Sequence, residues 1–271
     1  MITDKKIGSI IFLGAGKMAE AIFSRLISKT GIDPQSIIVS DIDSKRLAYL
    51  KNKHGIRIAS SNEEAVSEPG AIVLAVKPQN MKDLLTEISA KVGKRLVISI
   101  AAGVKTKKIE EQLTQSRVVR VMPNTAAIVG QAITAISRGS WASDEDVEAT
   151  REIFSSVGEV MEVDEKLQNS VTAVSGSGPA YFFYLVELLA EAGKSTGLDD
   201  EQSLKLATQT AIGAGELLRT GREAKELREM VTSKGGTTEA AIKAFQENKL
   251  SDIVRTAVQQ ASTRAKEISE G

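Results

Sequence analysis

Two short glycine-rich segments carry the residue types best suited to binding anions. The first, Gly14-Ala15-Gly16, follows an apolar run and precedes an amphipathic segment in which Ala19 completes a GxGxxA pattern. A strand, a tight glycine turn and a helix form the context that a dinucleotide-binding fingerprint requires. Gly14 allows a sharp turn, and Gly16 lets the backbone approach a pyrophosphate at the helix N-terminus. The alternative is an ordinary glycine turn in an α/β domain.

The second segment, SKGGTTEAA at residues 233–241, places Gly235-Gly236 directly before a helix that begins with Thr237 and Thr238. Free N–H groups without side chains in the way form a site for a carboxylate or a phosphate. The alternative is a flexible loop with a threonine cap. A further loop, SGSGPAY from Ser175, puts serines and glycines at the mouth of an apolar helix, which makes Ser175 a candidate substrate-binding residue.

Asp41 follows the second apolar run, at the point where a dinucleotide fold places a carboxylate for the ribose hydroxyls. Its charge repels a 2′-phosphate, so Asp41 favours NADH slightly, while Lys45 and Arg46 one turn later act in the opposite direction. The alternative role for Asp41 is to cap the helix that follows.

Composition excludes several kinds of chemistry. The sequence has no cysteine and a single histidine, His54, so it contains no disulfide, and a zinc centre or a Ser-His-Asp triad is hard to build. We expect His54 to be a solvated residue at a helix end and expect no metal site. The 35 basic and 35 acidic residues cancel, which disfavours nucleic acid or a membrane as partner. Without an apolar signal region or a run of about 18 apolar residues, the chain is expected to be cytoplasmic.

The elements that position these residues alternate between strand and helix through the first half of the chain. Strands are expected near 7–13, 36–40, 56–58, 71–76, 95–100, 117–122, 132–137 and 160–163, with helices between most of them. This alternation predicts a Rossmann-type, doubly wound parallel sheet whose ligands bind beyond the carboxyl ends of the strands. That rule puts on one rim Gly14, Gly16, Asp41, Asn62, Lys77, Pro78, Ala101 and Asn124.

The second half changes character. From Glu165 onward the sequence shows no convincing strand, and helices are expected at about 180–196, 200–219, 224–231, 238–246 and 251–270. We therefore predict a dinucleotide-binding domain at 1–164 and an all-α dimerisation domain at 165–271. The helix from residue 180 is apolar on most sides, so we expect it to be buried, most of all against a second copy of the chain in a homodimer.

The segments GAGKMAEA, AVKPQ, SIAAGV, MPNT, SGSGPAYFF and GGTTEAA occur in the order and spacing of one family. The whole chain closely resembles pyrroline-5-carboxylate reductase, and the SGSGPAY and GGTT segments are far more specific than the first motif. The resemblance implies a Rossmann domain, a helical domain that interleaves into a dimer, and often a ring of dimers. It also implies hydride transfer from NADPH or NADH to the ring C=N of L-1-pyrroline-5-carboxylate, giving L-proline in the last step of proline biosynthesis.

The resemblance also assigns residues. It places the substrate carboxylate on the backbone N–H groups of Gly236, Thr237 and Thr238, makes the Thr238 hydroxyl the catalytic hydrogen-bond partner of the ring nitrogen, and matches Glu165 to an acidic residue near the substrate. Lys234 departs from the proline usual in the family. The family often prefers NADPH, a choice that Asp41 puts in doubt. The cofactor-binding residues are then Gly14, Gly16, Lys17, Met18, Asp41, Asn62, Ala75, Val76, Lys77, Pro78 and Ala101.

The substrate explains why no metal or histidine is needed. A protonated imine is already a good electrophile, so we expect catalysis by positioning, with Thr238 as a proton relay. A dehydrogenase of related architecture acting on another small carboxylate would need a catalytic lysine, and Lys194 and Lys205 lie in no recognisable motif. A non-catalytic, dinucleotide-binding redox sensor would not need the GGTT loop.

Overall fold

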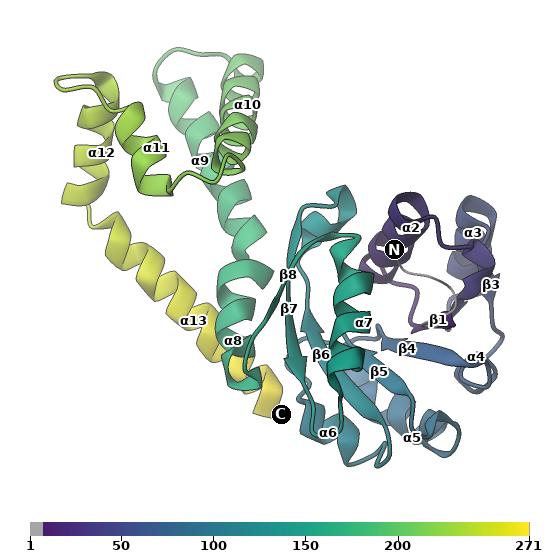
Figure 1. Cartoon of the computed structure of the whole chain (residues 1–271). Coiled ribbons are helices and arrows are strands. Elements are labelled where there is room, and N and C mark those ends of the chain that lie inside the picture. The colour runs from purple at the N-terminus through teal and green to yellow at the C-terminus, as the bar shows by residue number, and fades with distance from the viewer. Residues whose placement is uncertain (1–7, 271) are drawn as a thin grey trace. The chain divides into compact units, whose positions relative to one another are not determined.

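The computed structural model describes residues 8–270, and these residues form two units (Figure 1). The first unit runs to Gly176 and also contains the residues from Ala261 onward, and the second unit is Ser177–Gln260. The predicted domain boundary after residue 164 differs from this division, because residues 165–176 and the C-terminal turns group with the sheet.

One sheet of eight strands forms the first unit. Its spatial order is β3-β2-β1-β4-β5-β6-β7-β8. Strands β1 to β6 are mutually parallel, and the order reverses between β1 and β4, which form the switch point where such sheets bind nucleotides. The strands are β1 (Ser9–Leu13), β2 (Ile37–Ser40), β3 (Arg57–Ile58), β4 (Gly70–Leu74), β5 (Leu96–Ser99), β6 (Arg117–Met122), β7 (Ala132–Arg138) and β8 (Gly158–Glu162).

Helices cover both faces of this sheet, as the continuous apolar strands require. Alternate residues of β1 enter different cores: Ile10 and Phe12 pack with one set of helices, and Ile11 and Leu13 pack with the other. The first set is α2 (Lys17–Thr30), α3 (Ser44–His54) and α7 (Asp144–Ser155), and the second is α4 (Asn62–Ala65), α5 (Met81–Val92) and α6 (Thr106–Glu110). Short 3₁₀ turns are η1 (Pro34–Ser36), η2 (Pro78–Asn80), η3 (Thr125–Val129) and η4 (Glu165–Leu167).

The far edge of the sheet departs from the all-parallel prediction. Strand β7 is antiparallel to β6, and β8 is parallel to β7. The segment 123–131 between β6 and β7 is too short for a crossover helix, which a parallel pair needs, so the chain turns back directly. Helix α7 does supply a crossover between β7 and β8. Its N-terminus carries a complete capping box, since Ser143 and Asp146 each accept a hydrogen bond from the other's backbone.

The second unit is helical. It contains α9 (Gly178–Ser195), α10 (Asp200–Leu218), α11 (Ala224–Met230), α12 (Thr237–Glu247) and the first part of α13 (Leu250–Glu270). Before it, α8 (Gln168–Val171) and a π-helical turn at Thr172–Gly176 belong to the first unit and were not predicted. None of the helices between residues 8 and 270 is long and apolar enough to span a membrane.

Helix α9 is not buried within the single chain, so its predicted burial against a second copy stays a prediction. Phe182 and Phe183 are each 65% exposed, and Leu188 is also exposed. The helix does pack against α10, where a side chain at Gly193 would contact the Ser203 hydroxyl.

Candidate active site

The turn after β1 has the geometry of a phosphate-binding loop. Gly14 has φ of +110°, and a Cβ there would lie 2.6 Å from the carbonyl oxygen of Ala75 in the turn after β4. The Gly14 N–H donates to the carbonyl of Ser40 at the end of β2. Gly14 is therefore needed because two neighbouring strand ends approach it closely.

Gly16 meets a different requirement. It is the N-cap of α2, no side chain caps this helix, and no protein atom lies within 4 Å of the place where a Cβ would be. The N–H groups of the first turn, which includes Lys17 and Met18, have no acceptor within the helix and lie at its positive end. Ala19 is buried, as the third small position of the motif requires. These residues fit a dinucleotide pyrophosphate.

Asp41 lies beside this loop. Its Oδ2 accepts a hydrogen bond from the N–H of Ala15 at 2.6 Å, and its Oδ1 accepts one from the N–H of Asp43 at 2.9 Å. Arg46 Nε donates to the Ala15 carbonyl at 2.9 Å, and its Nη2 donates to Glu20 at 2.5 Å. Asp41 and Arg46 therefore both hydrogen-bond to the backbone of Ala15 and hold the glycine loop in place.

Glu20 in α2 lies at the centre of a cluster of three basic side chains. Besides Arg46, it contacts Lys53 Nζ and His54 Nε2, each at 3.0 Å. Partial burial raises the pKa of Glu20, but hydrogen bonds from His54, Arg46 and Lys53 outweigh burial and lower that pKa to about 2. The expectation of a solvated His54 is wrong: the ring is half-buried, pairs with Glu20 and packs edge-on against Phe23.

The other predicted cofactor residues follow neighbouring strands. Ala75, Val76, Lys77 and Pro78 follow β4, and Pro78 begins the turn η2. Ala101 follows β5 and is buried. Their sequence positions put them at the carboxyl edge that also holds the glycine loop.

Three polar residues near this edge have internal partners. Asn62 Oδ1 accepts from Ser40 Oγ at 2.6 Å, and its Nδ2 donates to Glu87 at 2.8 Å. Asn124 caps the turn η3 through Ala126 N–H. Ser175 Oγ donates to the Val171 carbonyl within the π-helical turn. A side chain at the adjacent Gly176 would lie 2.7 Å from Met122 Cε, so this turn packs against the end of β6.

The carboxylate of Glu165 has its hydrogen-bond and ion-pair partners within the first unit. Its Oε1 accepts from the Thr106 N–H at 2.7 Å, and its Oε2 accepts from the Thr106 hydroxyl at 2.9 Å. Arg120 Nη1 lies 3.4 Å from the same carboxylate. Sequence reasoning missed Thr106 and Arg120. The signal for Arg120 was a charged residue inside the apolar strand 117–122.

The GGTT segment lies in the second unit and begins α12. Gly235 has φ of +74°, and Gly236 is the N-cap, with no side chain capping the helix. The arrangement differs from expectation at Gly236, whose N–H donates to the Ser233 carbonyl at 3.0 Å. The N–H groups of Thr237 and Thr238 belong to the first helical turn, which leaves them without backbone acceptors in the helix. Glu239 accepts from the Gly235 N–H at 2.6 Å and holds the loop in place.

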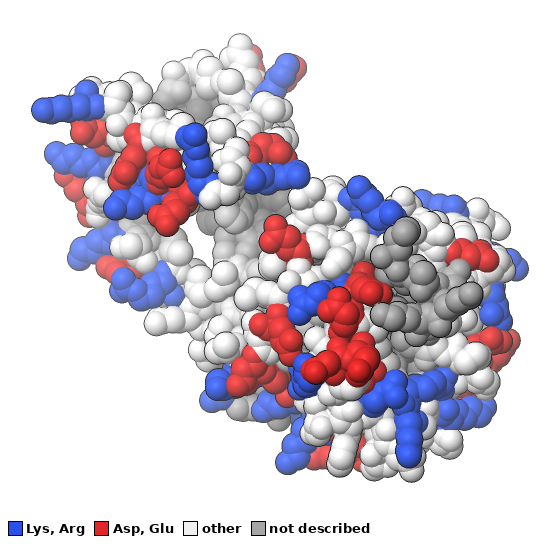
Figure 2. Space-filling model, viewed as in Figure 1, with Lys and Arg blue, Asp and Glu red and all other residues white. Residues whose placement is uncertain are grey.

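The arrangement suits dinucleotide binding at one sheet edge and anion binding at one helix terminus. Within residues 8–270, no group of His, Asp or Glu is arranged to hold a metal ion. Basic and acidic side chains are interspersed over the face shown in Figure 2.

Comparison with known proteins decides the family. Residues 165–268 match the pyrroline-5-carboxylate reductase dimerisation domain, and residues 9–103 match the F420-dependent NADP oxidoreductase family. A pyrroline-5-carboxylate reductase from Methanosarcina acetivorans is 41% identical, over 98% of this chain and 99% of that protein. The chain belongs to the pyrroline-5-carboxylate reductase family. It is thus an NAD(P)H-dependent oxidoreductase with a Rossmann-type domain and a helical dimerisation domain, as the sequence predicted.

Solved structures agree with this assignment. A pyrroline-5-carboxylate reductase from Coxiella burnetii superposes with a TM-score of 0.91 at 37% identity, covering 96% of this chain and 98% of that one. The Plasmodium falciparum enzyme, solved with NADP bound, gives a TM-score of 0.84 at 29% identity over 96% of this chain and 98% of its own.

Proposed function

We propose that this chain reduces L-1-pyrroline-5-carboxylate to L-proline. The full-length identity to pyrroline-5-carboxylate reductases carries this proposal, because both the dinucleotide edge and the GGTT segment fall within it. NAD(P)H delivers a hydride from C4 of the nicotinamide to the imine carbon, the C=N π bond becomes the nitrogen lone pair, and a proton ends on nitrogen. The redox-sensor alternative is disfavoured, as is a dehydrogenase for another carboxylate.

The cofactor is proposed to lie along the carboxyl edge of the sheet. Its pyrophosphate would meet the uncapped N-terminus of α2 at Gly16, Lys17 and Met18, and its adenosine ribose would approach Asp41. Its nicotinamide end would approach the turns after β4 and β5. The further proposed contacts are Gly14, Asn62, Ala75, Val76, Lys77, Pro78 and Ala101.

The substrate carboxylate is proposed to bind the N–H groups of Thr237 and Thr238 at the start of α12. A carboxylate is favoured there by the unpaired donors and by the helix dipole. Gly236 contributes by its lack of a side chain rather than by its N–H, which the turn already uses. Ser175, in the turn packed against Met122, is proposed as a further substrate contact.

Thr238 is proposed as the catalytic hydrogen-bond partner of the ring nitrogen. We predict that Thr238→Ala lowers kcat about 100-fold, the lower range for losing a positioned proton-transfer group, and leaves the Kd for NADH unchanged. Thr237→Ala is the matched control, because it keeps the backbone N–H and removes only the neighbouring hydroxyl. Steady-state kinetics with a fluorescence titration of NADH would check this. Equal kcat values for the two variants would remove Thr238 from the mechanism.

We also propose that NADH is preferred over NADPH. Asp41 is held beside the glycine loop, and a 2′-phosphate near it would meet a carboxylate. Arg46, one of the two basic residues that follow Asp41, already donates to Ala15 and Glu20. The Plasmodium relative was solved with NADP, so the ratio of kcat/KM for the two cofactors decides the preference.

The active form is proposed to be a homodimer built through the helical unit, with a ring of dimers as the larger assembly that the family suggests. Apolar side chains on α9 and α10 are exposed, including Phe183 and Leu204. Side chains at Gly213 and Gly215 of α10 would meet no atom of the described residues within 4 Å apart from the helix's own adjacent backbone, so these positions leave room for close helix contact with a second copy.

A further inference from the structure

The loop between β5 and α6, residues 100–105, is held by two residues that come much later in the chain. It follows the carboxyl end of β5, and its Ala101, Gly103 and Val104 are buried. Under the proposed function, this loop lies at the nicotinamide end of the cofactor. Its position therefore bears on hydride transfer.

The first residue that holds the loop is Glu165. Helix α6 begins at Thr106, and the side chain of its N-cap residue, Lys105, makes no capping hydrogen bond. Glu165 takes this role instead, because its two carboxylate oxygens accept from the N–H and the hydroxyl of Thr106 at 2.7 and 2.9 Å. A carboxylate at a helix N-terminus is also favoured by the helix dipole. Glu165 therefore fixes the end of the loop.

Arg120 forms an ion pair with Glu165. Its side chain is only 3% exposed, and its Nη1 lies 3.4 Å from Glu165 Oε1. Burial lowers the pKa of the Arg120 guanidinium, and the Glu165 carboxylate opposes that shift. Since a buried cation needs its counter-ion, moving Glu165 away from its place beside Thr106 and Arg120 would leave Arg120 unpaired.

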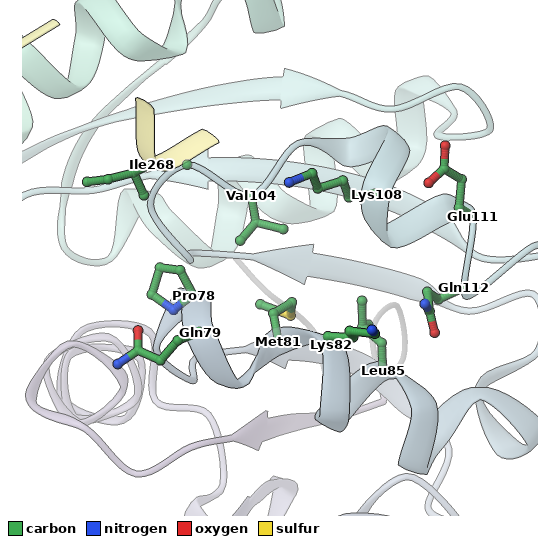
Figure 3. A pocket seen from close by; sticks show the side chains of 11 residues that line it. Pro78, Gln79, Met81, Lys82, Leu85, Val104, Lys108, Glu111, Gln112 and Ile268 are labelled. Atoms are coloured by element: carbon green, nitrogen blue, oxygen red, sulfur yellow. The ribbon is translucent and has the colours of Figure 1, made fainter. Parts of the chain in front are cut away.

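The second residue is Ile268 in the last turns of α13. Gly103 has φ of +78°, and a Cβ there would lie 2.7 Å from Ile268 Cγ2 and 3.2 Å from the backbone carbon of Ile268. Figure 3 shows Ile268 beside Val104 at the edge of a cavity of about 710 Å³, with Pro78 and Gln79 on the opposite side. Ile268 therefore packs against the loop beside an open cavity. Truncating Ile268 would allow the loop to move toward that cavity.

We propose that Glu165 and Ile268 are positioning residues that hold the 100–105 loop in place for hydride transfer. Glu165 then acts through Thr106 and does not touch the substrate, which replaces the role that the sequence assigned to it. The inference rests on the proposed function for the link to the nicotinamide. Hydride transfer needs reacting atoms about 3–3.5 Å apart, and a misplacement of about 1 Å costs on the order of 100-fold in rate.

The test compares Glu165→Gln and Ile268→Ala with matched controls. Glu159→Gln changes an exposed glutamate on β8, and Ile58→Ala truncates an isoleucine on the edge strand β3 that is 38% exposed, close to the 44% of Ile268. Each variant is assayed for kcat, for KM of both substrates and for the Kd of NADH by fluorescence, at a temperature where all are folded. We expect both test variants to lose at least tenfold in kcat and to bind NADH more weakly, with KM for pyrroline-5-carboxylate within twofold of wild type.

Two results would overturn the proposal. A raised KM for pyrroline-5-carboxylate with unchanged NADH binding in Glu165→Gln would mean that Glu165 contacts the substrate. Test variants indistinguishable from their controls would mean that the loop does not depend on these residues. Should Glu165→Gln fail to fold, Thr106→Val removes one of the two hydrogen bonds and Thr106→Ser restores it, with the same expectations. NADH binding is measured without substrate, so it tests the loop even if the wild type reduces another imine.

Discussion

The two units solve the problem of burying apolar surface in opposite ways. In the first unit, the chain covers its own core: Phe12, Phe23 and Phe154 are completely buried between the sheet and its helices. In residues 177–260, the buried apolar side chains are only those of Ala190 and Ala207, while the large ones on α9 and α10 are exposed. Contiguous exposed apolar surface of this kind marks an interaction site. The first unit thus covers its core within one chain, whereas the second, which matches a dimerisation domain, leaves its large apolar side chains exposed.

The largest expected effect comes from placing a charge on the exposed apolar surface. Phe183→Asp should convert the proposed homodimer to monomer and lower reductase activity at least 100-fold, because an unpaired carboxylate would have to be buried at the contact. Light scattering after size-exclusion chromatography measures the mass. Trp141→Asp is the matched control, since Trp141 is also 65% exposed but lies in the first unit. A fully active dimer of Phe183→Asp would refute the assignment of this surface.

A core truncation should act in the opposite way. Phe154→Ala removes a buried ring of the first unit and should lower the free energy of unfolding by about 3–5 kcal/mol, independently of protein concentration. Phe182→Ala should instead lower the free energy of unfolding by an amount that increases as the protein is diluted. Urea unfolding at two protein concentrations, followed by the fluorescence of the single tryptophan, distinguishes the two. The contrast fails if both variants respond to dilution in the same way.

Acid should weaken the first unit through Glu20. Its pKa is about 2 in the folded chain against an ordinary value of 4.5, so the folded state holds fewer protons there. The resulting stability, of the order of 3 kcal/mol at most, is fully present above pH 4.5 and is lost as pH falls toward 2. The difference in unfolding free energy between wild type and Glu20→Gln should therefore shrink between pH 5 and pH 3. A constant difference over this interval would show that Glu20 is not held by its cations.

The smallest effect concerns cofactor choice and should leave the second unit unchanged. Asp41→Ser should shift the ratio of kcat/KM for NADPH over NADH upward by about tenfold, or ~1.4 kcal/mol, because a carboxylate no longer repels the 2′-phosphate. The oligomeric state should stay the same. Asp33→Ser, which changes an acidic cap elsewhere in the first unit, should not alter the ratio. An unaltered ratio in Asp41→Ser would remove Asp41 from cofactor selection.

Much of the first unit was predictable because its signals are local. Apolar runs, the glycine turn and the capping residue Ser143 act within a few residues, so the strand and helix positions agree closely with the structure. The antiparallel direction of β7 was also predictable, since segment 123–131 is too short to contain a crossover helix.

What the sequence could not show depends on contacts between distant residues. His54 is half-buried because Glu20 and Phe23 on another helix reach it. Glu165 contacts Thr106 only after the sheet has brought the two together. The return of α13 to Gly103 likewise has no local signal. The exposed state of α9 could be anticipated only as an apolar helix in need of a partner.

The most direct test of the account is to follow the hydride itself. Pyrroline-5-carboxylate is incubated with the wild-type protein and NADH carrying two deuterium atoms at C4, and the product is analysed by mass spectrometry and NMR. We predict proline with one deuterium at the carbon that was doubly bonded to nitrogen, formed in equal amount to the NADH consumed. Unlabelled proline, or NADH binding without any proline, would contradict the proposed reaction.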